Sequence, residues 1–334
     1  MRIGINGFGR IGRQAFKAIL KRHPDLEVVA INDLFDTQTN AHLLRYDSNY
    51  GKFDGAIEAR EDALIVKGKR VDVSAERDWT QLRWAERGVD LVIESTGVGT
   101  NRPDAAKHLE AGAKKVIISA PAREEDITIV LGVNQDKYDP ATHHIISNAS
   151  CTTNGLSPVV KVILDTYGIE KGMMTTVHSY TNSQKVLDVA SKDLREARAA
   201  ALNIVPTATG AARAVALVIP EVKGIVDGLA YRVPTPTVSI VEFVALTKKN
   251  ATKDDVNAAL RRAADGSMKG VLAVTDEPLV SMDLKGNENS SIVDSLVTMV
   301  VGDNMVKVAA WYDNEWGYAC RISDLAALVS RAGA

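Results

Sequence analysis

The chain contains two cysteines, Cys151 and Cys320, and the first lies in a segment of small polar residues, SNASCTTNGL. An apolar-periodic stretch follows, so the pattern predicts that Cys151 stands at or just before a helix N-terminus. The positive end of a helix dipole stabilises a thiolate. Because inert cysteines prefer apolar surroundings, this context makes Cys151 a candidate nucleophile, with a small structural residue as the alternative.

His178 is the candidate partner of this thiol. It lies in MMTTVHSYTNSQ, where 174–180 reads as a strand that ends shortly after the histidine. A histidine can take the thiol proton as a base and later return it as an acid. A single histidine is more often structural, and local sequence leaves both interpretations open.

A second candidate site follows the first strand of the chain. Gly7, Gly9 and Gly12 have G-x-G-x-x-G spacing between a short strand, 2–6, and an amphipathic helix, 10–22. Gly7 permits a tight turn, Gly9 lets the backbone approach a pyrophosphate, and Gly12 lets helix and strand pack closely. A pyrophosphate would then lie at the helix N-terminus, where N–H groups and the helix dipole favour an anion.

Asp33 extends the predicted pyrophosphate site to a site for a whole dinucleotide. It ends a second strand, 26–32, about 20 residues after the glycines. An acid at that distance accepts hydrogen bonds from the ribose hydroxyls. It would also repel a 2′-phosphate, so the sequence predicts NAD in preference to NADP.

Strands and helices alternate through the rest of the first half. Repeated βα units predict a mostly parallel, doubly wound, Rossmann-like α/β sheet covered on both faces. Ligands bind at the carboxyl ends of such strands, where Thr96 and Ser119 lie, although ordinary loop polarity also explains these two residues. The expected strands are 89–95, 115–120, 127–133 and 145–147, with a helix over 103–111.

The second half reads as an α+β domain with a mostly antiparallel sheet. Its expected strands include 238–247, 296–301 and 305–311, and a last helix opens at 314–318. Arg232, Thr181 and the Thr209-Gly210 pair offer a guanidinium, hydroxyls and a backbone N–H at a helix start, which are suitable donors to phosphate. Taken singly, each is more often a surface arginine or a turn residue.

The composition argues against several classes of function. Lys+Arg is 40 and Asp+Glu is 42, giving a formal net charge of -2, so we expect no nucleic-acid partner. No apolar run reaches the ~18 residues of a membrane span, and the N-terminus enters a strand without an export signal. Two cysteines make neither a disulfide framework nor a four-thiolate zinc site. We therefore expect a cytoplasmic location, no membrane association and no metal.

Six motifs together resemble the phosphorylating glyceraldehyde-3-phosphate dehydrogenases of bacterial type. Their order and spacing fit that family over essentially the whole chain, and SNASCTTN and WYDNEWGY are highly specific to its superfamily. The motifs are INGFGRIGR at 5–13, SNASCTTN at 147–154, HSYTN at 178–182, TATGAA at 207–212, RVPTPTVS at 232–239 and WYDNEWGY at 311–318.

The resemblance implies a covalent mechanism. Cys151 would attack the aldehyde of glyceraldehyde 3-phosphate, with His178 as base and NAD as hydride acceptor. Inorganic phosphate would then cleave the thioester to 1,3-bisphosphoglycerate. The backbone N–H of Cys151 and the His178 side chain would stabilise the oxyanion.

The resemblance also assigns binding residues and domains. It implies an NAD-binding domain over 1–150, joined by the C-terminal helix 315–334, a catalytic domain over 151–314 and a homotetramer in which the polar segment 180–203 reaches a neighbouring subunit. One phosphate site would use Ser150, Thr152 and Thr209-Gly210, and the other, for the substrate phosphate, Thr181 and Arg232. The implied NAD contacts are Arg10, Ile11, Asp33, Arg77, Ser119 and Asn314.

Four positions depart from the family pattern. Gly155 replaces a second cysteine, which the chemistry does not require. Gly99 stands where an aromatic residue often walls the adenine pocket, so we expect looser adenine packing. Val189-Ala190 replaces the Leu-Pro that helps exclude NADP, so we expect partial NADP use. Glu196 replaces an arginine near the inorganic phosphate, so that site is weaker unless Arg195 or Arg198 compensates.

Three other functions remain open at this point. Erythrose-4-phosphate dehydrogenase would use the same thiol with hydrolysis instead of phosphorolysis, but Tyr180-Thr181-Asn182 and TATGAA favour the glyceraldehyde enzyme. An NADP-linked enzyme would work in the biosynthetic direction. A non-catalytic RNA-binding role would need a basic face, which the composition does not provide.

Overall fold

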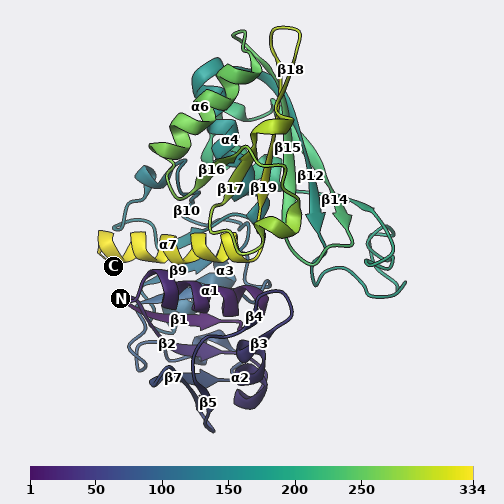
Figure 1. Ribbon diagram of the computed structural model, residues 1–334. Helices are drawn as coiled ribbons and strands as arrows, with labels where there is room; N and C mark the ends of the chain where they lie inside the picture. The colour runs from purple at the N-terminus through teal and green to yellow at the C-terminus, as the bar shows by residue number, and fades with distance from the viewer. Residues whose placement is uncertain (334) are drawn as a thin grey trace. The chain divides into compact units, whose positions relative to one another are not determined.

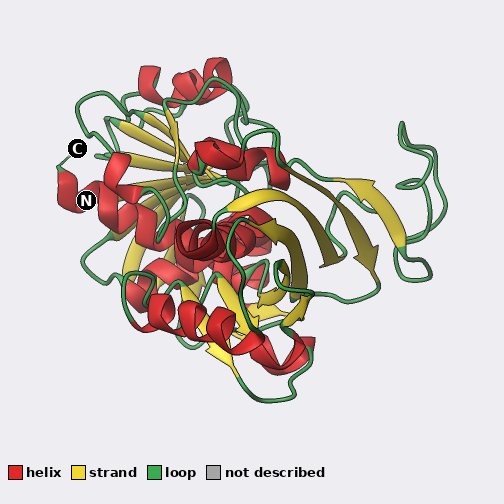
Figure 2. Ribbon diagram, turned by 90° about the horizontal axis from the view of Figure 1, so that it is seen from above, coloured by secondary structure: helices red, strands yellow, loops and turns green. Residues whose placement is uncertain are grey.

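The computed structural model describes residues 1–333, which form two compact units (Figure 1). The first contains Met1–Ile129, Asp136–Ala149 and the C-terminal segment from Ala319. The second contains Val130–Gln135 and Ser150–Tyr318. Each unit has its own sheet and its own helices, as the yellow strands and red helices of Figure 2 show.

The sheet of the first unit is mostly parallel, as the βα alternation predicted. Its strands as far as β7 pair in parallel, whereas β6 and β5 add an antiparallel edge beyond β7 that the sequence analysis did not anticipate. Helix α1 packs on β2 and α3 packs on β9. The order of strands is β10 (Ile127–Thr128), β11 (Ile145–Ser147), β9 (Lys115–Ile118), β8 (Leu91–Glu94), β1 (Arg2–Asn6), β2 (Glu27–Asn32), β7 (Lys69–Ser74), β6 (Ala63–Val66) and β5 (Ile57–Ala59).

The last helix joins the first unit through charged contacts. Asp324 of α7 (Trp316–Ala332) accepts from the Arg22 side chain at 3.0 Å, and His23 Nε2 lies 2.6 Å from the same carboxylate. Arg22 ends α1 (Arg10–Arg22), so these contacts connect the two helices, which run side by side in Figure 1. The C-terminal segment therefore packs with the nucleotide-binding motif although some 300 residues separate them in sequence.

The sheet of the second unit is mostly antiparallel. Only the β12–β14 and β16–β17 pairs run parallel among its pairings within residues 1–333. These two sheets confirm the predicted fold class. The order of strands is β13 (Val205–Ala208), β14 (Val226–Val233), β12 (Ile169–Ser179), β15 (Ser239–Thr247), β19 (Met305–Tyr312), β17 (Ser291–Asp294) and β16 (Leu272–Thr275), and β18 (Met299–Val301) also pairs with β19.

One face of this second sheet is covered and the other is more open. Along β15 the residues alternate between buried and partly exposed, the period of two expected for a half-covered strand. Helix α4 (Cys151–Tyr167) packs on β15, β17 and β19, and it also contacts α5 (Ala211–Val218) and α6 (Lys253–Asp265). The helices therefore gather on the face that includes the buried side chain of His178.

Two predicted strands are wrong in extent. Only Ile127–Thr128 of the expected strand 127–133 pairs, because the chain then turns at Val130, whose N–H is accepted by Asn134 Oδ1 at 2.9 Å. The expected strand 296–301 divides into a 3-10 turn, η5 (Ser295–Val297), and β18. Asp294 Oδ1 accepts from Leu296 N at 3.1 Å and closes that turn.

The remaining elements are short and support loops. The segment between β12 and β13 has no regular strand or helix and projects beside β14 in Figure 1. No helix within residues 1–333 is long and apolar enough to cross a membrane. The other elements are α2 (Thr37–Arg45), α3 (Arg102–Glu110), β3 (Tyr46–Asp47), β4 (Gly51–Lys52), η1 (Trp79–Gln81), η2 (Gln135–Lys137), η3 (Pro220–Val222) and η4 (Ser281–Leu284).

Candidate active site

Cys151 is the first residue of α4, where the sequence analysis placed it. The chain reaches it through a sharp turn in which Ala149 has a φ of 54°, a left-handed conformation that is strained for a residue with a side chain. Ser150 caps the helix, and its Oγ accepts from Thr153 N at 3.0 Å. Cys151 as a residue is partly exposed.

His178 lies beside this thiol. Its Nε2 is 3.4 Å from Cys151 Sγ, within hydrogen-bonding distance for sulfur. The histidine is held near the end of β12, which pairs with β14 on one side and β15 on the other. Its side chain is only 4% exposed, and its ring meets that of Tyr312 edge-on at 5.9 Å. The imidazole therefore has little freedom to leave the sulfur.

The other ring nitrogen of His178 has two neighbours. Nδ1 lies 2.7 Å from the carbonyl oxygen of Ser179 and 2.6 Å from Nη1 of Arg232. It cannot donate to the carbonyl and accept from the guanidinium at once. We assign the proton to Nδ1, donated to Ser179, because Arg232 Nη1 also reaches that oxygen at 3.3 Å. In this tautomer Nε2 is unprotonated and can accept the thiol proton.

Both groups are neutral in this arrangement. Burial, aided by the charge of Arg232, lowers the pKa of His178 to about 3. Desolvation raises the pKa of the Cys151 thiol, although the charge of Arg232 and the N–H donors of the first helical turn act in the opposite direction. We expected the helix N-terminus to lower this pKa, but desolvation is the larger influence. These pKa shifts therefore favour a neutral thiol that gives up its proton during attack, and they disfavour a permanent thiolate.

Tyr312 was not identified from the sequence, although it lies within the WYDNEWGY motif. Its hydroxyl lies 2.9 Å from Thr152 Oγ1 and 2.7 Å from Thr176 Oγ1, so it connects the start of α4 to β12. Burial raises the pKa of Tyr312, which keeps it a neutral hydrogen-bonding group. Tyr312 also closely faces Gly155, where an added Cβ would lie 3.0 Å from its ring. The Cys151–His178 pair is therefore fixed by a buried polar contact.

The candidate phosphate-binding residues fall into different surroundings. The Thr152 hydroxyl faces Tyr312, so only its backbone remains for an anion. Thr209 Oγ1 accepts from Ala211 N at 3.1 Å beside the start of α5, and open space surrounds Gly210. Thr181 Oγ1 lies 3.0 Å from Ser183 Oγ. Among the candidates, Arg232 is brought directly to the Cys151–His178 pair.

Arg232 also carries an unused donor. Its Nε is buried and has no hydrogen-bond partner within residues 1–333. A buried guanidinium donor without a partner is costly, and an anionic oxygen would satisfy it. This favours an anion beside Arg232.

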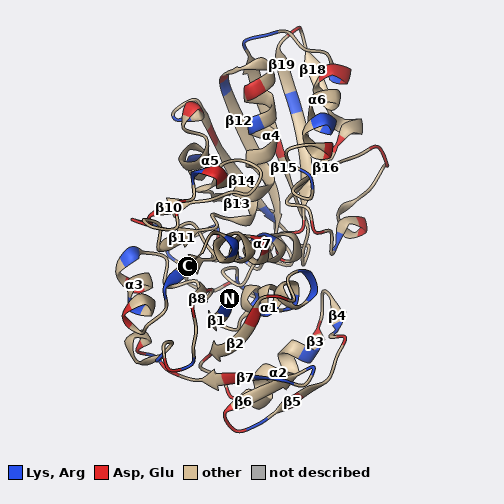
Figure 3. Cartoon of the chain, turned by 90° about the vertical axis from the view of Figure 1, so that its left-hand side faces the viewer, with Lys and Arg blue, Asp and Glu red and all other residues tan. Residues whose placement is uncertain are grey.

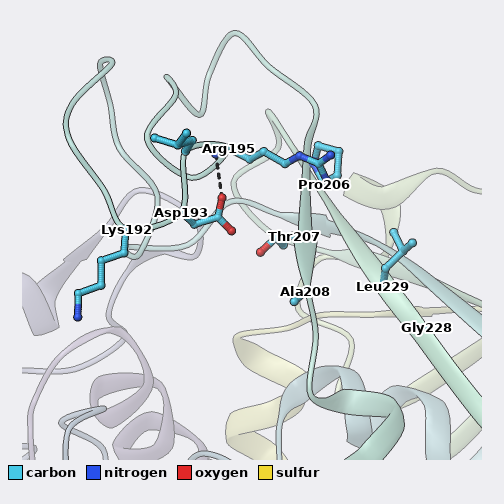
Figure 4. Close-up of a pocket in the computed structure, with 9 residues that line it drawn as sticks. Lys192, Asp193, Arg195, Pro206, Thr207, Ala208, Gly228 and Leu229 are labelled. Atoms are coloured by element: carbon cyan, nitrogen blue, oxygen red, sulfur yellow. Dashed lines mark hydrogen bonds between the residues drawn. The ribbon is translucent and has the colours of Figure 1, made fainter.

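Glu196 is tied to the sheet by a hydrogen bond. Its Oε1 accepts from Thr207 Oγ1 of β13 at 2.7 Å. Arg198 pairs instead with Asp188 at 3.0 Å, so it is not turned to Glu196. Arg195 is exposed and borders a groove of about 930 Å³, where Figure 4 shows its side chain reaching toward Pro206. Compensation of Glu196 by Arg195 stays a prediction.

The glycines of the first unit shape the start of a cleft. Gly7 has a φ of +88°, and a Cβ there would lie 2.6 Å from Thr96 N. A Cβ on Gly12 would lie 2.1 Å from Gly7 O, so only glycine lets α1 approach the strand. Gly9, by contrast, faces open space and is the N-cap of α1. An anion can therefore approach the helix N-terminus over Gly9.

The cleft has about 590 Å³ and is bordered by Gly7, Gly9, Asp33, Arg77 and Thr96, all of them candidates from the sequence. Asp33 Oδ2 accepts from Phe8 N at 2.8 Å and Oδ1 from Phe35 N at 3.1 Å. Each carboxylate oxygen keeps a second lone pair for a ribose hydroxyl. A turn open at the helix start, an oriented acid and a cleft of this volume fit a dinucleotide.

The other candidate cofactor residues do not border this cleft. Arg10 and Ile11 form the first turn of α1, and the Arg10 guanidinium pairs with Asp47 at 2.9 Å. Ser119 follows β9. Asn314 belongs to the second unit, where its Oδ1 accepts from Ser179 Oγ at 2.9 Å and Ser239 Oγ at 3.0 Å. No cluster of three or more potential metal ligands occurs within residues 1–333.

Comparison with known proteins gives consistent matches. The family model described as "Glyceraldehyde 3-phosphate dehydrogenase, NAD binding domain" matches residues 1–102. The family model described as "Glyceraldehyde 3-phosphate dehydrogenase, C-terminal domain" matches residues 150–314. The chain is 61% identical over 333 residues to the glyceraldehyde-3-phosphate dehydrogenase of Geobacillus stearothermophilus, covering 100% of this chain and 99% of that protein. It is 60% identical over 333 residues, with the same coverage, to glyceraldehyde-3-phosphate dehydrogenase 1 of Bacillus subtilis. It is 56% identical over 330 residues to a relative from Streptomyces coelicolor, covering 98% of each chain.

Proposed function

Because the chain belongs to the glyceraldehyde-3-phosphate dehydrogenase family, we propose that it oxidises glyceraldehyde 3-phosphate with NAD and inorganic phosphate to give 1,3-bisphosphoglycerate. The membership confirms the resemblance of the sequence motifs. The observation that carries the reaction is the 3.4 Å separation of Cys151 Sγ and His178 Nε2. NAD is the cofactor, held by the cleft of the first unit.

Cys151 begins the reaction. Its sulfur forms a bond to the aldehyde carbon while the thiol proton passes to His178 Nε2, and His178 then returns this proton to the aldehyde oxygen, which becomes the hydroxyl of a thiohemiacetal. The backbone N–H at the start of α4 and the His178 side chain stabilise the developing oxyanion. When bound, NAD supplies the acceptor for the hydride that leaves the substrate carbon.

His178 and Cys151 then complete the cycle. His178 Nε2 takes the hydroxyl proton of the thiohemiacetal as the hydride leaves the carbon and the thioester forms, and it holds this proton for the sulfur. An oxygen of inorganic phosphate attacks the thioester carbonyl, the carbon–sulfur bond breaks and the sulfur recovers a proton. The thioester retains energy of oxidation that hydrolysis would release.

We assign the substrate phosphate to Arg232, with Thr181 as a second donor. The buried, unpaired Nε of Arg232 supports this assignment. The charge of Arg232 lowers the pKa of His178, so an anion that neutralises this charge raises the basicity of the imidazole. Substrate binding thus strengthens the base just before it is needed. Ser150, Thr152, Thr209 and Gly210 are assigned to inorganic phosphate.

The remaining cofactor assignments follow the cleft and the family. Gly7, Gly9, Arg10, Ile11 and Gly12 form the pyrophosphate turn, and Asp33 holds the adenosine ribose. Residues 1–150 and 315–334 serve as the NAD-binding domain, and 151–314 as the catalytic domain. Arg77, Thr96, Ser119 and Asn314 complete the contacts assigned to NAD.

We also propose a homotetramer, because the open face of the second sheet exposes apolar side chains beside the Lys307–Glu242 ion pair. Strand register aligns Met173 of β12 with Val244 of β15, and Met173 is 66% exposed. Leu229 of β14 and Met299 of β18 are 37% and 52% exposed. Sedimentation of Met173→Glu should give smaller species than the wild-type protein, whereas exposed Leu217→Glu on α5, away from that sheet face, should not. Equal assembly of Met173→Glu and wild type would contradict this interface.

A cytoplasmic location is proposed because Cys151 must stay a free thiol for this chemistry. A nucleic-acid partner is not proposed: the net charge is -2, and Figure 3 shows Lys and Arg interspersed with Asp and Glu along the chain.

A steady-state assay of the purified protein tests the function. It compares NAD with NADP and glyceraldehyde 3-phosphate with erythrose 4-phosphate, each with and without phosphate. We expect the highest kcat/KM with NAD and glyceraldehyde 3-phosphate, and turnover that requires phosphate. Phosphate-independent turnover of erythrose 4-phosphate, or a preference for NADP, would instead support one of the alternative enzymes.

A further inference from the structure

The loop after β8 contains a glycine whose space is taken by another side chain. Gly99 is buried, and a Cβ at this position would lie 2.7 Å from both Cη2 and Cζ3 of Trp79. Its backbone does not require glycine, since its φ is outside the left-handed region. The residue is therefore small because the six-membered ring of Trp79 occupies the adjacent volume.

Trp79 is anchored on its own side. It begins the 3-10 turn η1, which Asp78 caps by accepting from Thr80 N at 3.1 Å. Its ring stacks on the imidazole of His108, with ring centroids 5.1 Å apart and planes 12° from parallel. Lys107 Nζ lies 5.9 Å from the centre of the Trp79 ring. These contacts fix the ring beside Gly99.

A network of buried hydrogen bonds connects the histidine beneath Trp79 to the loop that contains Thr96. Trp84 Nε1 donates to His108 Nδ1 at 3.1 Å, so the His108 proton resides on Nε2, 3.0 Å from Glu94 Oε2. The other oxygen of Glu94 accepts from Thr96 N at 2.8 Å. The ring on which Trp79 stacks is thus fixed by the same carboxylate that orders the turn at Thr96.

Trp79 also borders the nucleotide cleft, where the other apolar side chains are exposed. Leu34 is 52%, Phe35 67% and Val98 70% exposed, and all three border this cleft together with Trp79 and Asp33. Exposed apolar groups of this kind, next to an acid that accepts from hydroxyls, suit a flat purine attached to a ribose.

We propose that Trp79 is the aromatic wall of the adenine subsite and supplies from η1 the surface that Gly99 lacks. The inference rests on the proposed use of NAD. It replaces the expectation that glycine at position 99 loosens adenine packing: the space is filled from a residue 20 positions earlier in the chain. Trp79 and Gly99 form a matched pair, so each tolerates replacement only when the other changes with it.

A four-protein comparison tests the pair. Calorimetry would measure binding of NAD and of ADP-ribose, which lacks nicotinamide, to wild type, Trp79→Ala, Gly99→Phe and the double variant. Trp79→Ala should weaken both ligands roughly 5- to 100-fold, the effect of losing one base–aromatic contact. Gly99→Phe should also weaken binding because the two rings cannot share the space. The double variant should bind more tightly than either single variant.

Fluorescence provides a second measurement, which does not require the protein to tolerate alanine at position 79. ADP-ribose should change the tryptophan emission of the wild-type protein, and Trp79→Phe should remove most of that change while Trp311→Phe retains it. Melting temperatures of all variants without ligand identify any loss of folding.

The possible results separate this inference from the proposed function. If wild type binds neither NAD nor ADP-ribose, the proposed use of NAD fails. If wild type binds both but Trp79→Ala binds equally well, or the double variant is no better than Gly99→Phe, the wall assignment alone is wrong. A ligand-induced emission change that survives in Trp79→Phe would overturn it as well.

Discussion

Replacing His178 by asparagine removes the only ring nitrogen found next to the sulfur of Cys151 within residues 1–333. Asparagine retains an amide that can donate to the Ser179 carbonyl, which now lies 2.7 Å from Nδ1. It cannot accept the thiol proton as an imidazole does. The change therefore tests proton transfer while disturbing the buried hydrogen bond as little as possible.

The expected loss is large because no solvent base can take the place of His178. Its side chain is 4% exposed, and Nε2 is 3.4 Å from Sγ. A positioned general base contributes about 10²- to 10⁴-fold, or roughly 3–5 kcal/mol of transition-state stabilisation. The desolvated, neutral thiol makes the higher part of this range the expectation, since attack then requires the proton to leave.

Single-turnover mixing measures this step. Enzyme saturated with NAD is mixed with glyceraldehyde 3-phosphate without phosphate, and the rate of NADH appearance is recorded. The matched control is His144→Asn, which changes an exposed histidine in the same manner. Melting temperatures and NAD affinity of both variants should remain near those of wild type.

Two results would refute the reasoning. A folded His178→Asn protein with an acylation rate within threefold of wild type would remove the imidazole from proton transfer. An equal slowing in His144→Asn would mean that the loss is a general effect on the fold.

Three further changes follow from the same contacts. Cys151→Ala should abolish turnover in the steady-state assay while calorimetry still detects NAD binding. Asp33→Asn should raise the NADP/NAD ratio of kcat/KM about tenfold or more, because a charge that repels a 2′-phosphate is removed; an unchanged ratio would contradict the role of Asp33. The pKa of His178 is about 3 when folded and 6.5 in the unfolded reference, so only the unfolded chain binds this proton in between. The free energy of unfolding should therefore fall by about 1.4 kcal/mol per pH unit as pH drops below 6.5, and urea titrations should show a smaller fall for His178→Asn.

The sequence predicted the elements whose patterns are local. The glycine spacing and the helix over 10–22 depend on neighbours a few residues away, and Asp33 follows a strand whose apolar run is itself local, so these patterns survive in the fold. The same holds for Cys151 at the start of α4, where Ser150 supplies the cap. The strand predicted at 296–301 was partly wrong because a side-chain cap from Asp294 outweighs the apolar run.

Contacts between distant residues could not be derived in this way. Tyr312 meets Thr152 and Thr176 only because β19, β12 and α4 pack together, over separations of 160 and 136 residues. Trp79 and Gly99 likewise meet only after β8 enters the sheet. A glycine at position 99 therefore indicated a missing aromatic wall from sequence, whereas the fold places another ring there.

Mass spectrometry of the acylated enzyme tests the central claim most directly. Mixed with NAD and glyceraldehyde 3-phosphate without phosphate, the protein should release one NADH per chain and gain the mass of a 3-phosphoglyceroyl group on Cys151. The buried Cys320 serves as the internal control. Addition of phosphate should remove the group and restore turnover. Release of NADH without modification of Cys151, or with the 3-phosphoglyceroyl group on another residue, would contradict the account.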